Sequence, residues 1–510
     1  MTAPLPGPPR PVQWAKVVDH TRCIGCHACS TACKSENEVP LSVHRTYVKY
    51  AETGVFPQVR RAFQVTRCNQ CAEPPCVEAC PTAAMHARAD GIVDFDKSIC
   101  IGCKACMAAC PYDAIFINPE DGSAEKCNLC AHRLDVGLEP ACVVVCPTEA
   151  ILVGDLADPS SRVASIVGRE AVTVRRPEKG TRPKLFYQGA HQATLDPLAA
   201  RRPDGGLFMW SEQGALPHQV TSGHPGRHNS SAAALLAYDV PHRAPWDWRV
   251  SLYTWTKGVA AGAYLVPALL VLLGLLDADS ALWVWAAPIV AGSFLAATGV
   301  LLLADLEHPA RFYLIFARPQ WRSWLVRGAV FITGYGAVLF LHLLAGVLGG
   351  SGARMALTVA GVPLAAMTAV YTAYLFAQAR GRDLWQSPLL PPHFLAQALL
   401  AGAAALSLAA SALEKGDAGV LPWITAGGSL AHLLLVAGEA TFPHATAHAR
   451  LAAWEMTRGA YRHYFRTGAL LVAAGVLAPW AGPVAGALAL AGLLAYEHAH
   501  VQAAQAVPLA

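Results

Sequence analysis

The chain has 510 residues, of which 54% are hydrophobic, and a formal net charge of +4. This length is too great for one hydrophobic core, so two or more domains are expected. Lys and Arg form no long run, which argues against nucleic-acid binding. All 16 cysteines lie between Cys23 and Cys146, and none follows Ser251. The composition therefore predicts a cysteine-rich first half joined to an apolar, membrane-embedded second half.

The N-terminal stretch MTAPLPGPPRPVQW contains neither the apolar segment of a secretion signal nor a twin-arginine motif. The cysteines are therefore expected to meet a reducing cytosol. Under those conditions metal ligation is more common than disulfide formation.

Four runs of four cysteines use every cysteine in the chain. The first and third runs, CIGCHACSTAC and CIGCKACMAAC, have the spacing C-x2-C-x2-C-x3-C. The second run reads CNQCAEPPCVEAC, and the fourth has eleven residues between CNLC and CVVVC. The candidate metal ligands are Cys23, Cys26, Cys29, Cys33, Cys68, Cys71, Cys76, Cys80, Cys100, Cys103, Cys106, Cys110, Cys127, Cys130, Cys142 and Cys146.

This spacing matches the geometry of an iron–sulfur cubane. Three closely spaced thiolates can bind three irons from one loop, and the fourth cysteine points the other way. In two-cluster ferredoxins that fourth cysteine binds the other cluster and is followed by proline. Pro81, Pro111 and Pro147 follow this rule, whereas Lys34 replaces proline after the first run. Structural zinc is the alternative, but zinc sites usually use two CxxC pairs separated by a longer loop.

The residues after the last three runs repeat one pattern. CPTAAMHARADGIVDFD, CPYDAIFINPEDG and CPTEAILVGD each contain a short helix start, an apolar strand and an acidic turn. This is the ferredoxin repeat used twice. Residues 1–160 are therefore predicted to form an α+β, ferredoxin-like domain with four [4Fe-4S] clusters.

Residues 13–160 resemble the four-cluster electron-transfer subunits of molybdopterin oxidoreductases, of the NrfC, dimethyl sulfoxide reductase B and sulfite dehydrogenase types. DHTRCIGCHACSTACKSENEVP and EKCNLCAHRLDVGLEPACVVVCPTEAILVGDL are among the stretches that carry the resemblance. It implies a separate catalytic partner with a molybdenum or tungsten bis-pterin. It also implies cross-pairing of the runs into four ligand sets: Cys23, Cys26, Cys29 and Cys146; Cys33, Cys127, Cys130 and Cys142; Cys68, Cys71, Cys76 and Cys110; and Cys80, Cys100, Cys103 and Cys106.

Residues 161–249 are neither cysteine-rich nor apolar enough to span a membrane. We expect this linker to wrap the cluster domain, contact the catalytic partner and lead to the membrane. His218, His224 and His228 lack the spacing of a metal site and are interpreted as loop histidines.

Residues 250–510 are predicted to form an all-α transmembrane bundle of eight helices, because about 20 apolar residues cross the hydrocarbon. A soluble helical bundle would need polar faces that these segments mostly lack. The predicted spans are 254–276, 281–304, 324–348, 355–377, 393–413, 419–440, 463–479 and 481–500.

Eight spans place both ends of this half on one side of the membrane, called side A. Side B then holds only Arg354 and Lys415, and the positive-inside rule makes side A the cytoplasm. The protein is thus predicted in the inner membrane, with its clusters and both termini in the cytoplasm. The basic residues assigned to side A are Lys257, Arg311, Arg318, Arg322, Arg327, Arg380, Arg382, Arg450, Arg458, Arg462 and Arg466.

The membrane half has its own resemblance. WDWRVSLYTWTKGVAAGAYLV and LLLADLEHPARFYLIFARPQWRSWLVRGA resemble the NrfD, polysulfide reductase and DmsC-type membrane anchors that react with quinone. The resemblance implies ubiquinone or menaquinone and no haem. His342 and His432 lie inside spans without an evident partner, so bis-histidine haem ligation is not expected.

Ionisable residues at membrane depth are costly and tend to be functional. A quinone needs a hydrogen-bond donor to each carbonyl and a route for two protons, which His, Tyr and carboxylates supply. Simple anchoring of helix ends, with Asp305 paired to Arg311, is the alternative. The candidates at the side A ends are Asp305, His308, Glu439, Tyr253, Arg311, Tyr374 and His393.

The sequence therefore predicts an electron-transfer and membrane-anchor subunit that connects quinone to a catalytic subunit, with no substrate-transforming site of its own. Sulfite oxidation is the first choice for the complex, and reduction of polysulfide, thiosulfate or a sulfoxide is the next. A second hypothesis is an ion-translocating subunit, for which Tyr335, His342 and His432 would form a polar path. A third, in which the clusters serve only structure, fits poorly with sixteen ligands in ferredoxin order.

Overall fold

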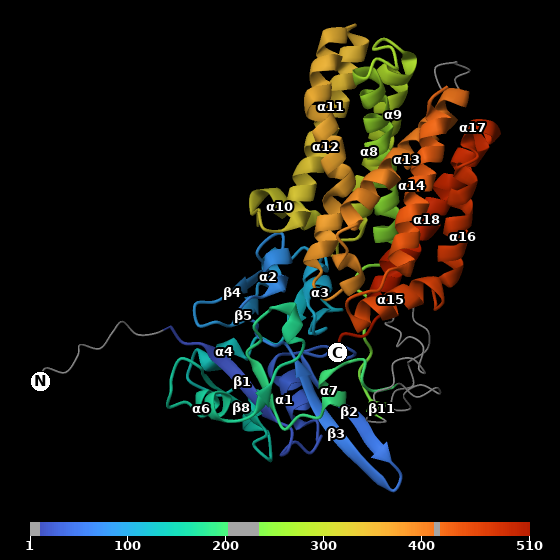
Figure 1. The fold of residues 1–510 in the computed structure, drawn as a ribbon. Helices are drawn as coiled ribbons and strands as arrows, with labels where there is room; N and C mark the ends of the chain where they lie inside the picture. The colour runs from blue at the N-terminus through green and yellow to red at the C-terminus, as the bar shows by residue number, and fades with distance from the viewer. Residues whose placement is uncertain (1–10, 202–233, 413–418) are drawn as a thin grey trace, which may run out of the picture. The chain divides into compact units, whose positions relative to one another are not determined.

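The computed structural model describes residues 11–201, 234–412 and 419–510 (Figure 1). The loop histidines of residues 202–233 and Lys415 lie outside these ranges. The chain divides into two compact units. Unit 1 contains Met1–Arg243 together with Pro508–Ala510, and unit 2 contains Ala244–Val507.

Unit 1 contains mixed sheets and short helices, as predicted for the cysteine-rich half. One sheet has the strand order β8-β1-β10-β9, in which β1 pairs parallel with β10 and antiparallel with β8. A second sheet has the order β11-β2-β3. The bounds are β1 Trp14–Asp19, β2 Thr46–Val55, β3 Gln58–Arg67, β8 Ile151–Asp155, β9 Val172–Thr173, β10 Leu185–Gln188 and β11 Leu235–Tyr238. Strands from the segment predicted as a linker thus complete both sheets.

Two short hairpins follow the second and third cysteine runs, where the repeated pattern predicts apolar strands. They are β4 Met85–Ala87 with β5 Val93–Phe95, and β6 Ile115–Ile117 with β7 Ala124–Lys126. The cysteines themselves lie on or beside short helices. The helices of unit 1 are α1 Ala28–Glu36, α2 Pro75–Ala79, α3 Ala105–Ala109, α4 Ala131–Leu134, α5 Ala141–Val144, α6 Arg162–Arg169 and α7 Gln192–Leu195, with 3-10 turns η1 Lys97–Ile99 and η2 Pro177–Lys179.

Proline ends two of the cysteine helices. Cys80 and Cys110 cap α2 and α3 in extended conformations, and Pro81 and Pro111 follow them. A residue before proline is disfavoured in the α region, so the helix stops at the cysteine. This sharp stop leaves the thiol at the helix end rather than on its side.

Unit 2 is a helical bundle with seven helices among its described residues that are long and apolar enough to cross a membrane. They are α8 Trp248–Leu272, the π turn η4 Leu282–Ala286 continued by α9 Ala287–Ala304, α11 Trp324–Val347, α12 Ser351–Gln378, α13 Leu390–Ala412, α14 Leu421–Thr441 and α18 Pro483–Gln505. Shorter helices connect them: η5 Pro309–Arg311, α10 Leu314–Ala317, η6 Asp383–Gln386, α15 Ala447–Thr457, α16 Arg462–Gly475 and α17 Ala478–Ala481.

The predicted span 463–479 is where structure and prediction differ. α16 has 14 residues and is about 21 Å long at 1.5 Å per residue, shorter than the roughly 30 Å hydrocarbon core. Pro479 lies in the first turn of α17 and Gly482 has a φ of 61° before α18. α16 ends at Gly475, and a turn at residues 476–477 separates it from α17.

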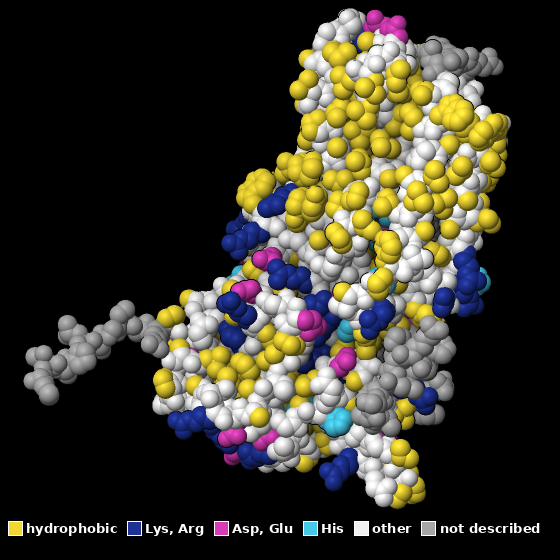
Figure 2. Space-filling model, viewed as in Figure 1, with side chains coloured by type: hydrophobic (Ala, Val, Ile, Leu, Met, Phe, Trp, Pro, Cys, Tyr) yellow, Lys and Arg dark blue, Asp and Glu magenta, His cyan; other side chains and the backbone are white. Residues whose placement is uncertain are grey.

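The surface of the bundle is apolar, which a soluble protein would avoid. Val359 is 80% exposed, Leu470 72% and Phe340 67%. Figure 2 shows hydrophobic side chains over most of the visible face of the bundle, with Lys and Arg gathered at the end that carries α10 and α15. Because lipid is the one solvent that suits such a surface, unit 2 is a multi-pass membrane domain.

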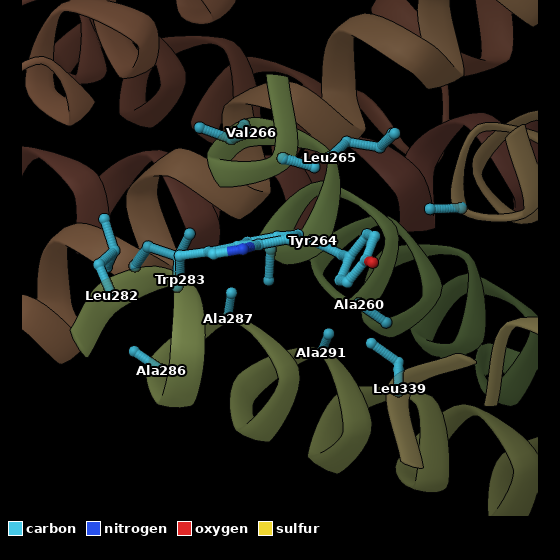
Figure 3. Close-up of a cluster of buried hydrophobic side chains, with 14 of the residues drawn as sticks. Ala260, Tyr264, Leu265, Val266, Leu282, Trp283, Ala286, Ala287, Ala291 and Leu339 are labelled. Carbon is cyan, nitrogen blue, oxygen red and sulfur yellow. The ribbon is translucent and has the colours of Figure 1, made fainter. Parts of the chain in front are cut away.

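The interior of the bundle contains a cluster of aromatic and small side chains (Figure 3). Tyr264 and Trp283 face each other with ring centroids 5.1 Å apart. Tyr335 donates to the backbone oxygen of Ala260 at 2.7 Å, and His342 Nε2 lies 3.2 Å from the backbone oxygen of Trp283. The hydroxyl of Tyr335 is thus engaged with helix backbone inside an apolar core.

Two glycines allow α8 and α13 to approach closely. A Cβ added to Gly262 would lie 1.7 Å from the backbone oxygen of Ala398, and one added to Gly402 would lie 2.0 Å from the carbonyl carbon of Gly262. Small residues at such crossings let helix backbones touch, which is how membrane helices gain packing energy.

We predict that Gly262→Ala destabilises the protein, because the added methyl group forces α8 away from α13. Overpacking of this kind typically costs about 1–3 kcal/mol, and the melting temperature of the detergent-solubilised protein measures it. Gly258→Ala is the matched control, since a Cβ there meets no atom within 4 Å. Equal melting temperatures for the two variants would contradict the prediction.

Candidate functional site

Unit 1 contains three cavities that are each lined by four cysteines. Their volumes are about 320, 310 and 360 Å³. Their cysteines define set 1 (Cys23, Cys26, Cys29 and Cys146), set 3 (Cys68, Cys71, Cys76 and Cys110) and set 4 (Cys80, Cys100, Cys103 and Cys106).

The remaining cysteines, Cys33, Cys127, Cys130 and Cys142, are called set 2. Burial raises the pKa of Cys33 to about 12, and the thiols of Cys127, Cys142 and Cys130 add to the rise. These four thiols are therefore close together. Sets 1, 3 and 4 contain the cysteines that the family resemblance pairs, and set 2 consists of the four that remain.

Short helices explain how cysteines of one run reach two sets. Cys29 and Cys33 lie one turn apart on α1, and α1 packs beside α5, which carries Cys142. Residues four apart on a helix share one side but sit at different heights along its axis. Cys29 therefore belongs to set 1, and Cys33, one turn further along α1, belongs to set 2.

The sets are also neighbours of one another. Burial raises the pKa of Cys29, and Cys142 adds to the rise. Burial likewise raises the pKa of Cys68, with a contribution from Cys127, and that of Cys106, with a contribution from Cys76. Each of these pairs joins two different sets, so the sets follow one another in the order 1, 2, 3, 4.

The donor set fits a cubane cluster better than single ions. Among the described residues, no three Cys, His, Asp or Glu side chains converge as they would on one metal ion. A cubane places its irons at the corners of a larger body, so its thiolates surround a cavity instead. Backbone N–H groups point at the sulfurs, as from Ala150 to Cys146 at 3.3 Å and from Met85 to Cys80 at 3.4 Å.

Set 2 differs from the others in its surroundings. Burial alone would raise the pKa of Cys142, but Lys16 and Arg67 bring it down to about 7. Nδ2 of Asn37 lies 3.7 Å from the sulfurs of both Cys33 and Cys130.

Unit 2 contains a buried network of polar side chains from α13, α14 and α18. His393 Nε2 lies 2.8 Å from His432 Nδ1, and His393 Nδ1 lies 3.6 Å from Glu439 Oε1. Tyr496 donates to Glu439 Oε2 at 3.0 Å, and the ring of His500 stacks on that of Tyr496. None of these five side chains is more than 7% exposed. Such a chain of groups can hold and pass protons.

A cavity of about 270 Å³ lies within the same bundle. Lys257 on its wall donates to the backbone oxygen of Ala369 at 2.8 Å and to the hydroxyl of Thr372 at 2.7 Å. Glu497 also lines the cavity, and its Oε2 has no hydrogen-bond partner among the described residues. The other lining residues include Thr254, Trp255, Phe394 and Gln397.

The structure brings together two of the seven residues predicted for quinone, His393 and Glu439. The other five lie on other elements. Tyr253 is buried in α8, Asp305 caps α9, and His308 and Arg311 lie in the following connection. Tyr374 stacks on Trp324 with ring centroids 4.3 Å apart.

Sequence reasoning missed several members of this network. His432 was expected to lack a partner, and this is wrong, because His393 contacts it from the neighbouring helix. Lys257 was counted only as a basic residue of side A, and Glu497 was not considered. A lysine or glutamate inside an apolar segment is itself a functional signal, so both were recognisable from the sequence.

Comparisons with known proteins match both units. The family model described as 4Fe-4S dicluster domain matches residues 59–156. The model described as polysulphide reductase, NrfD, matches residues 239–482. This second match ends before α18, which contributes Tyr496, Glu497 and His500.

Curated relatives match the cysteine-rich unit. A tetrathionate reductase subunit of Salmonella typhimurium is 42% identical over 204 residues, which are 39% of this chain and 80% of the relative. A polysulfide reductase polypeptide of Wolinella succinogenes is 41% identical over 177 residues, 34% of this chain and 93% of the relative. The arsenate respiratory reductase iron–sulfur subunit of Shewanella is 36% identical over 219 residues, 34% of this chain and 94% of the relative.

Proposed function

We propose that this chain carries electrons between membrane quinone and a separate catalytic subunit. The chain belongs to the 4Fe-4S family of reductase iron–sulfur subunits, and it fuses such a subunit to an NrfD-type membrane domain. One observation supports this best. The four cysteine sets of unit 1 occur in the same chain as a buried histidine, glutamate and tyrosine network in the membrane unit. Clusters carry single electrons, and the network can exchange the accompanying protons.

We assign one [4Fe-4S] cluster to each of sets 1 to 4. Support comes from the four thiols around each of three cavities, and from the short helices that connect neighbouring sets. When bound, the clusters supply one-electron carriers; the chain supplies thiolates, backbone N–H donors and a dry environment. The order 1, 2, 3, 4 then makes a continuous route for electrons.

Set 1 is the end of the route that faces solvent. Cys26 is exposed, and Cys23 and Cys146 are half-buried, whereas the cysteines of sets 2, 3 and 4 are buried. Exposed apolar side chains lie beside these cysteines in the sequence, with Ile24 56% and Val144 63% exposed. We propose that the catalytic partner docks here, because electron transfer needs a short path to an exposed cluster.

The partner is proposed to hold a molybdenum or tungsten bis-pterin and to act on a small oxyanion or sulfur compound. The relatives' names refer to tetrathionate, polysulfide and arsenate. Sulfite oxidation remains the first proposal for this chain, with reduction of polysulfide, thiosulfate or a sulfoxide next.

Quinone or quinol, of the ubiquinone or menaquinone type, is proposed to react at the end of the bundle that holds His393 and Glu439. Histidine and tyrosine can donate hydrogen bonds to the two carbonyls, and Glu439 can accept a proton that leaves a quinol hydroxyl. Lys257 adds a buried amino group that can donate hydrogen bonds. Tyr253, Asp305, His308, Arg311 and Tyr374 stay predictions for the same end.

An eighth crossing of the membrane is proposed for α16 and α17 together. Glu439, near the end of α14, contacts Tyr496, near the end of α18, so both helices finish at the same level. The residues that connect them must return to the opposite level before α18 begins. α16 does run antiparallel to α18, since Gly468 lies near Tyr496 and Gly475 near Ala489. Eight crossings would put both ends of the membrane unit on the same side, and the basic residues assigned to that side favour the cytoplasm.

We predict that Cys33→Ala removes one cluster of four. Purified under anaerobic conditions, this variant should lose about one quarter of the bound iron and acid-labile sulfide, because set 2 loses a ligand. Ser30→Ala, on the same helix α1, is the control and should keep the wild-type content. Zinc in place of iron and sulfide would refute the assignment.

We predict that Glu439→Gln and His393→Gln each slow the reduction of the clusters by a quinol by about 100-fold or more, the usual loss when a proton-transfer group is removed. Stopped-flow absorbance of the clusters measures the rate, and dithionite should still reduce them fully. The control is His342→Gln, a buried histidine of a different contact group. Unchanged rates in both network variants would exclude this site.

We predict that the end of the bundle holding His393 faces the cytoplasm. An alkaline phosphatase fused after Gly350, between α11 and α12, should be active, because this enzyme folds only outside the reducing cytosol. The same reporter fused after Gln386, between α12 and α13, should be inactive. The reverse pattern would invert the proposed orientation.

A further inference from the structure

Two buried cations contact one cysteine of set 2. Lys16 lies on β1 and is 2% exposed, and Arg67 is the last residue of β3 and is 1% exposed. Nζ of Lys16 lies 3.3 Å, and Nη1 of Arg67 lies 3.1 Å, from Sγ of Cys142. Two strands from different sheets therefore converge on a single sulfur atom with positive charge.

Arg67 is not neutralised in the way that a buried arginine usually is. Its Nε and Nη2 are buried and have no hydrogen-bond partner among the described residues. Arg45, by contrast, is buried against the carboxylate of Glu125 at 2.8 Å. A buried guanidinium with unsatisfied donors is costly unless a negative group lies beside it. A thiolate-bound cluster in set 2 would be such a group.

Backbone N–H groups donate to sulfurs of sets 1, 3 and 4. Backbone N–H groups of Ala150, Gln70 and Ala124 donate to Cys146, Cys68 and Cys100 at 3.3, 3.5 and 3.5 Å. Lys126 is fully buried near set 3, but its Nζ donates to backbone oxygens, including that of Cys127 at 3.3 Å. Burial raises the pKa of Cys68, but the charges of Lys126 and Lys184 oppose that rise, so set 3 also has cations nearby. At set 2, however, two cations hydrogen-bond to one sulfur directly.

We infer that Lys16 and Arg67, through their direct contacts with the sulfur of Cys142, raise the reduction potential of the cluster in set 2, so that this second position of the row holds an electron more readily than it would without them. Reduction adds one negative charge to a cluster, and two cations near a ligand sulfur stabilise the reduced form more than the oxidised form. Hydrogen bonds to ligand atoms tune a metal centre in the same direction.

The electron balance of this step is simple. One electron leaves the cluster of set 1 or set 3, which is oxidised, and enters the cluster of set 2, which is reduced. No covalent bond forms or breaks, and no proton is required. The inference rests on the proposed function only in that a cluster must occupy set 2.

The test is a redox titration of the anaerobically purified full-length protein, followed by EPR spectroscopy of the reduced clusters. In Arg67→Met and in Lys16→Met, one of the cluster signals should become at least tenfold harder to reduce, a downward shift of about 59 mV or more. In Lys16→Met the other signals should keep their potentials. In Arg67→Met the signal of set 1 should also shift, but less, because Arg67 also favours the thiolate of Cys29. Arg67→Lys retains the charge and should shift the potential less than Arg67→Met.

A matched control is Arg61→Met, which removes the same charge from the same strand at an exposed position paired with Glu52. An equal shift in this control would attribute the effect to net charge and overturn the inference. An unshifted signal in both Arg67→Met and Lys16→Met would also overturn it. If Arg67→Met fails to assemble its clusters, Lys16→Met and Arg67→Lys still decide the question.

Cys33→Ala separates failure of this inference from failure of the proposed function. The signal that shifts in both cation variants should be the one that this variant removes. If Cys33→Ala removes no signal, set 2 holds no cluster, and the assignment of four clusters falls together with the inference. If it removes a signal whose potential the cation variants leave unchanged, only the inference falls.

Discussion

The interior of unit 1 is built from cysteine thiols, and the rest of that unit depends on this constraint. In one of its core clusters half of the buried residues are cysteines: Cys68, Cys71, Cys76, Cys80, Cys100, Cys106, Cys110 and Cys127. Thiols placed around cavities cannot pack as densely as a hydrocarbon core. Folding of such a unit is therefore coupled to whatever fills the cavities, because the binding free energy of a metal group is also folding free energy. The sheets and hairpins hold loops whose positions only a bound group makes stable.

In the membrane unit the main constraint is the free-energy cost of burying polar side chains. A charged or polar side chain in hydrocarbon must find a partner, and the bundle provides partners across helices rather than along them. His393 finds His432 and Glu439 on α14, while Lys257 finds backbone and hydroxyl oxygens on α12. Another part of the core contains Tyr264, Trp283 and Tyr335 in an apolar cluster instead. The buried histidine, glutamate and tyrosine network thus lies near the ends of α14 and α18, whereas Arg354 and Asp279 form a separate ion pair elsewhere in the bundle.

Lys16 and Arg67 place buried positive charge directly beside a cysteine sulfur in unit 1. Their cost is recovered only if a negative group lies at Cys142. A row of similar ligand sets can in this way contain clusters of different potential. The two cations that contact Cys142 directly, and not the cysteine ligands themselves, would tune a cluster in set 2.

Local spacing predicted much of this protein. Three cysteines that are separated by only two residues each can surround one body from a single loop, and an apolar segment of about 20 residues has few alternatives to crossing a membrane. The strands of the hairpins after the second and third runs are also predictable from local sequence, because an apolar stretch followed by an acidic turn involves only neighbouring residues. The end of α16 at Gly475 is harder to predict, because the apolar sequence continues beyond it to Pro479 and Gly482 without a charged residue.

The sequence by itself determined the ligands, the two-part organisation and the membrane character, because each depends on residues close together in the chain. Only the tertiary structure decided which helix supplies a partner to His432, that Lys257 and Glu497 line one cavity, and that β1 and β3 direct Lys16 and Arg67 to one sulfur. Each of those contacts joins residues at least 39 positions apart. Such distances leave no periodicity to read, since the packing of whole helices and strands brings these side chains together.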